Sequence, residues 1–203
     1  RGLGDVYKRQ LYTESFEGST TAPSSSLTFT DPNLPGTHQL TASSAPSGTV
    51  AVSNNNRGSA ANITNGNNWL DIFSNGSPLS NTITLSLAQP TRFFSFFMSD
   101  LHDDGDAHMN EFEVWIGGVG TGTKIYETSS LGVFSGTSPV TETISGESIT
   151  IGNGVPVFLG IEDSGNPFST ISIAWTDDGG AGDNWGIDPV SYTHLTLPTN
   201  GTV

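Results

Sequence analysis

The sequence has no cysteine and very few basic residues. Its 203 residues include 6 Lys and Arg against 20 Asp and Glu, which gives a formal net charge of −14 at pH 7. Without cysteine there is no disulfide framework and no thiolate metal site, so packing, hydrogen bonds or bound ions must stabilise the fold. Because a surface this acidic repels nucleic acids and anionic membranes, we expect no nucleic-acid partner.

Long apolar runs and helical patterns are also missing. No apolar stretch approaches the roughly 20 residues of a membrane-spanning helix, so we expect no membrane span in this fragment. No segment of more than two turns carries apolar residues at helical spacing. Phosphate-loop, nucleophile-elbow and zinc motifs are absent, so we expect no enzyme of those classes. The length and the hydrophobic content of 33% suit one domain.

The two ends of the chain differ in style from the middle. Half of the Lys and Arg residues lie in 1–10. One possible coding sequence for residues 5–10, taken on the opposite DNA strand, encodes residues 190–194. Both ends therefore resemble translated sequencing adaptor. We expect 1–10 and 190–203 to be non-native segments and 11–189 to be a single β-sandwich domain.

Alternating apolar and polar residues predict β-strands with one face in water. The pattern is clear in 82–87 and in 169–175, and in 111–116 it places Trp115 on the polar face, where its ring needs a cover. Residues 92–98 are apolar on both faces, so we expect a central, buried strand there. Further strands are expected near 11–16, 26–30, 38–43, 49–53, 69–73, 123–127, 140–144, 148–151 and 156–161.

Short strands separated by Gly, Asn, Pro and Asp, together with a surplus of Ser and Thr, are typical of extracellular β-proteins. The fold class that we predict is all-β. We expect a two-sheet antiparallel β-sandwich with a jelly-roll-like course, either galactose-binding-like or concanavalin-like.

The densest acidic segment directly follows the expected central strand. It contains Asp100, Asp103, Asp104 and Asp106, with a glycine that allows a sharp turn. Calcium takes six to eight oxygen ligands, and one short Asp-rich loop supplies several of them. The spacing is not that of an EF-hand. A calcium site and a solvated loop both remain open here.

A second acidic group comes from the two ends of the expected domain. In jelly-roll sandwiches the first and last strands commonly pair, which would bring Glu17 close to Asp188. Two carboxylates in a partly dry place do not both ionise easily unless a cation lies between them. We therefore expect calcium as a possible cofactor here, with plain exposed strand ends as the alternative.

Four short motifs carry a family resemblance. Residues 157–161, 167–173 and 184–188, with the opening Ser-Phe-Glu-Gly of 15–18, resemble β-sandwich domains of exported bacterial proteins that carry a PEP-CTERM sorting tail. The resemblance implies a jelly-roll-like sandwich that works outside the cell or at its surface. In such domains an Asp or Asn usually follows the last aspartate. Here Pro189 follows it, which would weaken the pairing of the last strand unless that strand is an edge.

Three tryptophans are candidate sugar platforms: Trp69, Trp115 and Trp185. Aromatic faces with polar neighbours bind carbohydrates, and the Asn-rich loops supply hydrogen-bonding groups. Each ring could equally belong to the core. We expect a non-catalytic extracellular module that binds polysaccharide, or one that has a structural role in a surface matrix.

A concanavalin-like glycoside hydrolase is the alternative function. Such an enzyme needs two carboxylates beside the sugar bond, and Glu111 and Glu113 share the polar face with Trp115. The Glu-x-Asp-x-x-Glu run of the concanavalin-like glucanases is incomplete in this sequence, which favours a module without catalysis.

Overall fold

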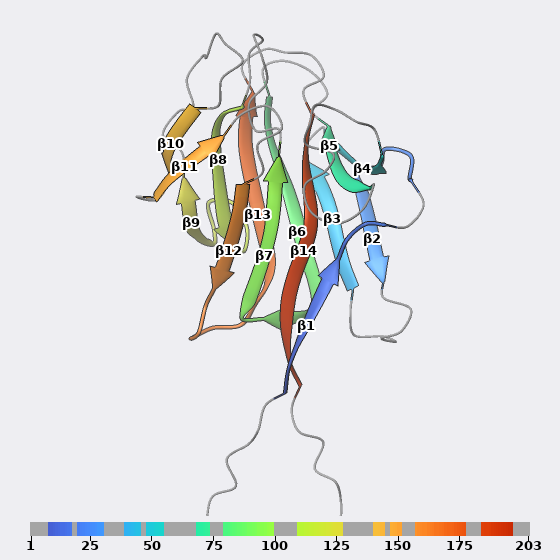
Figure 1. Cartoon of the computed structure of the whole chain (residues 1–203), viewed down its shortest axis with the longest axis vertical. Coiled ribbons are helices and arrows are strands. Elements are labelled where there is room, and N and C mark those ends of the chain that lie inside the picture. The colour runs from blue at the N-terminus through green and yellow to red at the C-terminus, as the bar shows by residue number, and fades with distance from the viewer. Residues whose placement is uncertain are drawn as a thin grey trace, which may run out of the picture.

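All described secondary structure is β-strand. The computed structural model describes residues 8–17, 20–30, 39–45, 48–54, 68–73, 79–99, 109–127, 140–144, 147–151, 157–177 and 184–196. The strands are β1 (Lys8–Glu14), β2 (Ser26–Thr30), β3 (Gln39–Ala45), β4 (Thr49–Ser53), β5 (Trp69–Phe73), β6 (Leu79–Thr91), β7 (Phe93–Ser99), β8 (Met109–Ile116), β9 (Thr123–Glu127), β10 (Val140–Ile144), β11 (Glu147–Ile151), β12 (Val157–Glu162), β13 (Phe168–Asp177) and β14 (Asn184–Thr196) (Figure 1). The predicted all-β class is confirmed, and each strand expected from the sequence has a counterpart. Within the described ranges no helix is long and apolar enough to cross a membrane.

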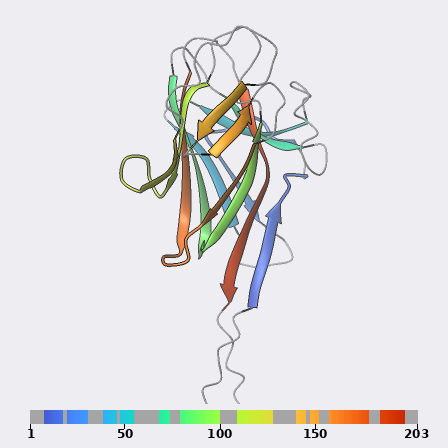
Figure 2. The same cartoon turned by 60° about the vertical axis from the view of Figure 1, so that its left-hand side comes forward.

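Two six-stranded antiparallel sheets form the sandwich. Sheet A has the order β12-β7-β14-β5-β4, with β1 also paired to β14, and sheet B has the order β2-β3-β6-β13-β8-β9. Strands β10 and β11 form a separate hairpin. The two large sheets lie face to face (Figures 1 and 2). The predicted two-sheet antiparallel sandwich is therefore confirmed.

Strand β14 joins both ends of the chain to sheet A. Its first half lies between β5 and β7, and its second half pairs with β1, where Glu14 is opposite Val190. The first and last strands pair as expected, but the paired part of β14 is 190–196, beyond the expected end of the domain at residue 189. Pro189 falls within a register shift between Ile187 and Val190. A proline without an N–H fits a bulge, so β14 stays central rather than becoming the edge strand that we considered.

The β1–β14 pair includes parts of both terminal segments that we expect to be non-native. Lys8 is opposite Thr196, and Gln10 is opposite His194. Tyr192 is buried and stacks on Tyr12, with ring centroids 5.6 Å apart. The adaptor origin of these segments stays a prediction.

The core fills the space between the sheets. Strand β13 contributes Ile171, Ile173 and Trp175, which are all buried, as the alternation predicts. Trp175 meets Trp185 of sheet A edge to face, with ring centroids 5.1 Å apart. Since period-2 alternation sends every second side chain inward, sheet B keeps its other face for polar residues.

Strand β7 lies inside sheet A, as expected, but its two faces differ. Phe94 and Phe96 are buried in the core, whereas Phe97 on the outer face is only half-buried. Phe97 packs against Phe158 of β12, which is 54% exposed, with ring centroids 5.0 Å apart. The expectation of a strand buried on both faces is therefore wrong for Phe97, whereas Ser95, on the same outer face, is buried at 5% exposure.

Candidate functional site

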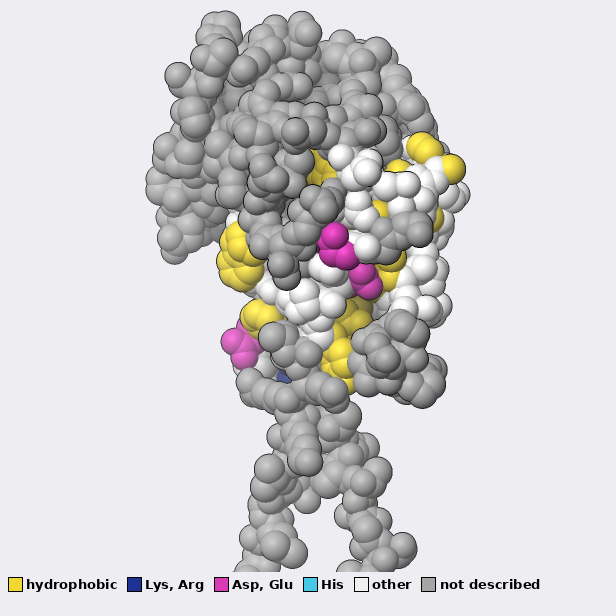
Figure 3. All heavy atoms as spheres, turned by 45° about the vertical axis from the view of Figure 1, so that its right-hand side comes forward, with side chains coloured by type: hydrophobic (Ala, Val, Ile, Leu, Met, Phe, Trp, Pro, Cys, Tyr) yellow, Lys and Arg dark blue, Asp and Glu magenta, His cyan; other side chains and the backbone are white. Residues whose placement is uncertain are grey.

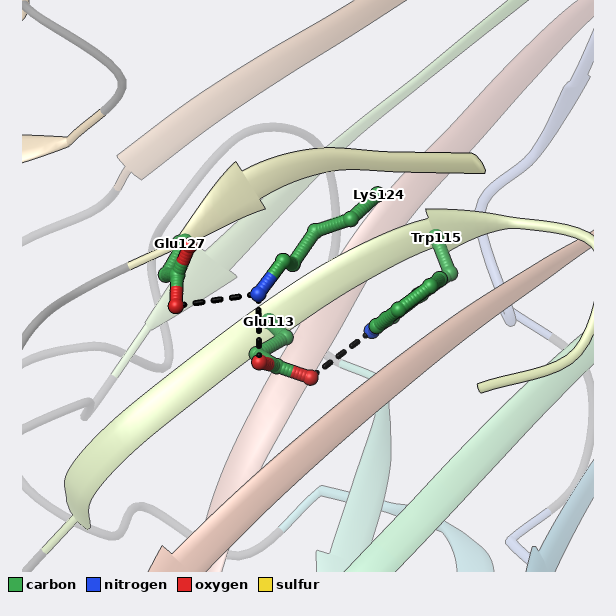
Figure 4. A network of polar contacts seen from close by, with 4 residues as sticks. All are labelled: Glu113, Trp115, Lys124 and Glu127. Atoms are coloured by element: carbon green, nitrogen blue, oxygen red, sulfur yellow. Dashed lines mark hydrogen bonds and ion pairs between the residues drawn. The ribbon is translucent and has the colours of Figure 1, made fainter. Parts of the chain in front are cut away.

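The candidate site is built around Trp115 on the outer face of sheet B. Val114 points into the core, so alternation turns Glu113 and Trp115 away from it. The Trp115 ring is half-buried. Its indole N–H donates a hydrogen bond of 2.9 Å to Glu113 Oε2, and Lys124 Nζ lies 5.5 Å from the ring centroid (Figure 4). The Glu113 and Lys124 side chains therefore cover part of the Trp115 ring, as expected for a tryptophan on the polar face of a strand.

A charge network fixes the edge of this ring. Lys124 Nζ lies 3.0 Å from Glu113 Oε1 and 2.9 Å from Glu127 Oε1. Burial alone would raise the pKa of Glu113, but the hydrogen bonds from Lys124 and Trp115 outweigh it and lower this pKa. Hydrogen bonds to Glu127 and Glu113 raise the pKa of Lys124. Glu113 and Lys124 are therefore both charged at neutral pH.

The turn between β8 and β9 sets Lys124 beside Trp115. Gly117 and Gly120 have φ values of 90° and 72°, which L side chains rarely adopt. A Cβ atom on Gly122 would collide with the carbonyl oxygen of Ile116. With this turn, the register places Trp115 opposite Lys124.

A row of hydroxyls crosses sheet B in register with Trp115. The paired residues along the row, from β2 to β9, are Ser26, Ser43, Thr84, Ser172, Trp115 and Lys124. The Thr84 and Ser172 hydroxyls lie 3.5 Å apart, and in the next row the Thr28 and Thr41 hydroxyls lie 3.1 Å apart. With strands about 4.8 Å apart, the row spans roughly 24 Å. Ser172, beside Trp115, is only 2% exposed, so the hydroxyls that this face offers are those of Ser26, Ser43 and Thr84.

The other two candidate tryptophans are buried. Trp185 is 3% exposed and lies in the core against Trp175. Trp69 is 4% exposed, and its ring lies across Gly186 on the face of sheet A that points away from the core. The structure does not bring the three rings together, and Trp115 alone of the three is accessible to a ligand in solution.

The acidic candidates are only partly described. The backbone N–H of Asn68, just before β5, donates a hydrogen bond of 3.1 Å to Glu17 Oε1. Asp188 is 6% exposed and lies where the neighbour of β14 changes from β5 to β1. The remaining members lie outside the described residues: Asp100, Asp103, Asp104 and Asp106. Within the described ranges no group of three His, Cys, Asp or Glu could hold a metal ion.

The geometry of Glu113 bears on the glycosidase alternative. A general acid needs a raised pKa, because it must carry its proton at the working pH. Hydrogen bonds from Lys124 and Trp115 lower the pKa of Glu113 instead. The Glu111 side chain lies outside the described residues. Glu113 therefore fits a positioning role for the indole better than acid catalysis.

Sequence reasoning missed several residues of this region. The positions of Lys124, Glu127 and the hydroxyl row beside Trp115 depend on which strands pair. No local sequence pattern shows that pairing. Asp71, which is fully buried, could have been noticed in the sequence. It is an acidic residue inside the otherwise apolar strand β5.

No protein-family model matches the sequence, and a search of curated proteins finds no match. Among solved structures, the chain is similar to the K2 adhesin domain of Lys-gingipain, with a TM-score of 0.48 and 15% identity over 91% of this chain and 100% of that one. It is also similar to the xylan-binding CBM22-1 domain of Xyn10C from Paenibacillus barcinonensis, with a TM-score of 0.44 and 14% identity over 93% of this chain and 95% of that one.

A third similar structure is the C-terminal family 22 carbohydrate-binding module of Clostridium thermocellum Xyn10B. Its TM-score is 0.43 and its identity 17%, over 100% of this chain and 99% of that one. Similarity at this level is one of general architecture, and a ligand does not follow from it. The function of this chain has to be argued from its own residues.

Proposed function

We propose that this chain is a non-catalytic carbohydrate-binding module, and that a polysaccharide lies across the outer face of sheet B on Trp115. The observation that carries the proposal is the half-exposed indole at the end of a hydroxyl row. A pyranose ring has an apolar C–H face that packs on an aromatic ring, and its hydroxyls bond to carboxylate, ammonium and hydroxyl groups at the edge. The aromatic ring is that of Trp115, the carboxylate that of Glu113 and the ammonium that of Lys124. The hydroxyl groups come from the row across sheet B.

The network around Trp115 supports binding because it holds the ring before the ligand arrives. The bond from the indole N–H to Glu113 and the ammonium of Lys124 limit the rotation of the ring. A side chain that is already ordered loses less entropy on binding. With a net charge of −14, the protein favours neutral glycans over anionic ones.

We further propose that the module works outside the cell and is stabilised by calcium. The resemblance of its motifs to exported bacterial sandwich domains supports the location. Alternation turns Asp71 and Asp188 to the same outer face of neighbouring strands, and both are buried. Two carboxylates in such a place favour a nearby cation.

Affinity electrophoresis against soluble neutral polysaccharides, together with pull-down on insoluble ones, tests the proposed function. Trp115→Ala should weaken binding roughly 30-fold or more, the effect of losing a central aromatic contact. Phe158→Ala is the matched control, because Phe158 is an exposed aromatic on the other sheet, 54% accessible. This control should bind as the unmodified protein does.

Two results would contradict the proposal. Equal binding by Trp115→Ala and the unmodified protein would remove Trp115 from the site, and loss of binding in Phe158→Ala alone would move the site to sheet A. If no polysaccharide binds at all, the structural role in a surface matrix replaces the binding function.

A further inference from the structure

Strand β2 is an open edge of the sandwich. It ends the order of sheet B, and within the described ranges only β3 pairs with it. The N–H of Ser44 donates a hydrogen bond of 3.0 Å to the carbonyl oxygen of Ser25, which lies opposite it. Hydrogen-bonded pairs alternate along an antiparallel ladder, so the backbone N–H and C=O groups of Thr28 and Thr30 point away from β3. No described residue bonds to these groups, and both threonines are exposed.

The other edges of the two sheets are protected against a further strand. Residues 21–24 bond to β4, where Ser24 and Val50 exchange hydrogen bonds of 2.9 and 2.7 Å. On β12, the Tyr126 hydroxyl donates a hydrogen bond of 3.0 Å to the Gly160 carbonyl oxygen. Strands β1 and β9 carry charged residues, which deter pairing. These residues are Lys8, Arg9, Glu14, Lys124 and Glu127. Strand β2 is short, at five residues, but its sequence Ser-Leu-Thr-Phe-Thr has no charge and no proline.

A cavity of about 300 Å³ lies beside this open edge, between the two sheets. Leu27 and Phe29 of β2 and Val52 of β4 are among its lining residues. Leu27 and Phe29 are only partly buried, although the residues opposite them on β3, Ala42 and Leu40, are 0% and 2% exposed. Figure 3 shows this side of the molecule, where hydrophobic side chains of the described residues reach the surface beside acidic ones. The inner face of the edge therefore keeps apolar surface that another strand would bury.

We propose that β2 binds an extended peptide of a partner protein as an added antiparallel strand of sheet B. Unpaired N–H and C=O groups along an edge are a template for another backbone. Because side chains alternate along a strand, every second residue of the peptide points inward beside Leu27 and Phe29, where the cavity has room for it. Apolar residues two positions apart therefore fit this edge.

The charge of the chain determines which peptide is favoured. With 6 Lys and Arg against 20 Asp and Glu, two copies of the chain repel each other. The described residues that line the cavity include one carboxylate, that of Glu14, and no Lys, Arg or His. A peptide that carries Lys or Arg beside its apolar positions is therefore favoured over an acidic peptide and over a second copy.

This inference does not rest on the proposed function. Trp115 lies on β8, and four strand intervals of about 4.8 Å each, roughly 19 Å in all, separate β8 from β2.

Titration of the full chain with the synthetic peptide Lys-Thr-Val-Thr-Val-Thr-Lys, followed by amide NMR, tests the proposal. The amides of Thr28 and Thr30 should shift saturably and exchange with solvent more slowly, because their N–H groups become bonded. With the valines inward, the threonine nitrogens of the peptide face β2 and the valine nitrogens face away. A peptide that is N-methylated at its threonines should therefore lose binding, whereas the matched peptide that is N-methylated at its valines should bind as the parent peptide does.

Two variants of Thr28 test the same edge from the side of the protein. Thr28→Pro removes an N–H that makes no bond to β3, and proline is compatible with an edge strand at such a position. It should weaken binding of the peptide about tenfold or more. Thr28→Val is the matched control, because it keeps the N–H and removes only the hydroxyl, and it should bind as the unmodified protein does. The methylated peptides keep the proposal testable on the unmodified protein if Thr28→Pro does not fold.

The proposal is overturned if the peptide causes no saturable shift at Thr28 and Thr30, if the two methylated peptides bind equally, or if Thr28→Pro binds as tightly as the unmodified protein. A peptide with Glu in place of both lysines should bind more weakly at low salt, and equal affinity would overturn the basic partner. A dimer in analytical ultracentrifugation of the peptide-free chain, with slow exchange of the Thr28 amide, would assign the edge to a second copy and overturn the proposal as well.

Discussion

Gly186 should be unable to accept even one methyl group while Trp69 is present. It lies on the central strand β14 between Asp71 and Ser99, and a Cβ atom added to it would collide with the six-membered part of the Trp69 ring. Trp69 is 4% exposed, so the ring has little room to move aside. Overpacking of this kind costs about 1–3 kcal/mol. In a chain of 203 residues, Gly186→Ala should lower the Tm by roughly 2–12 °C.

The sign of this effect should reverse once Trp69 is removed. Trp69→Ala alone should cost about 3–5 kcal/mol. In that background the new methyl group meets no ring, and Ala in a strand is favoured over Gly by roughly 0.5–1 kcal/mol. The double variant should therefore be more stable than Trp69→Ala, with a coupling energy of at least about 1 kcal/mol.

Chemical and thermal unfolding of the four proteins in this cycle gives the coupling energy directly. If Gly186→Ala destabilises both backgrounds equally, the collision with Trp69 is not the cause of its effect.

Three further predictions follow from the core, the charge network and the acidic groups. In calorimetric unfolding, Phe96→Ala should lower the free energy of unfolding by about 3–5 kcal/mol. Phe97→Ala, on the outer face of the same strand, should lower it by only about 1 kcal/mol. Equal losses of stability would contradict the assigned faces. Hydrogen bonds lower the pKa of Glu113, so its carboxylate stabilises the fold at neutral pH. This contribution to stability is lost as the pH falls below the ordinary pKa of 4.5 and through the lowered pKa of the folded state. Glu113→Gln should flatten the acid side of the stability profile, and an unchanged profile would remove this role. Calcium should raise the Tm, because an ion that binds only the folded state stabilises it, and excess chelator should reverse the rise; no shift would sink the calcium proposal.

The strands and their inward faces could be predicted from the sequence because they depend on local alternation. Ile171, Ile173 and Trp175 are buried as the period of two requires. The same rule turned Trp115 outward together with Glu113. It could not say that Phe97 would remain half-exposed, because the cover over a sheet comes from distant segments.

The candidate site could be predicted only in part. Alternation placed Trp115 on the polar face of its strand but gave no face for Trp185, which lies in the core. Which face of a strand is buried depends on the sheet packed against it. The cavity of about 300 Å³ beside β2 could not be predicted from the sequence, because its lining residues Glu14, Phe29 and Val52 come from three separate strands.

The sequence by itself determined the fold class, the strand positions and the acidic character, since composition and period-2 patterning act within a few residues. Tertiary structure alone decided strand order. It placed Ser172 between Thr84, 88 residues earlier, and Trp115, and it set Lys124 beside the indole. Strand order follows from the burial of both sheets against each other, which is a property of the whole chain, and it is this order that turns scattered serines, threonines and one tryptophan into a single face.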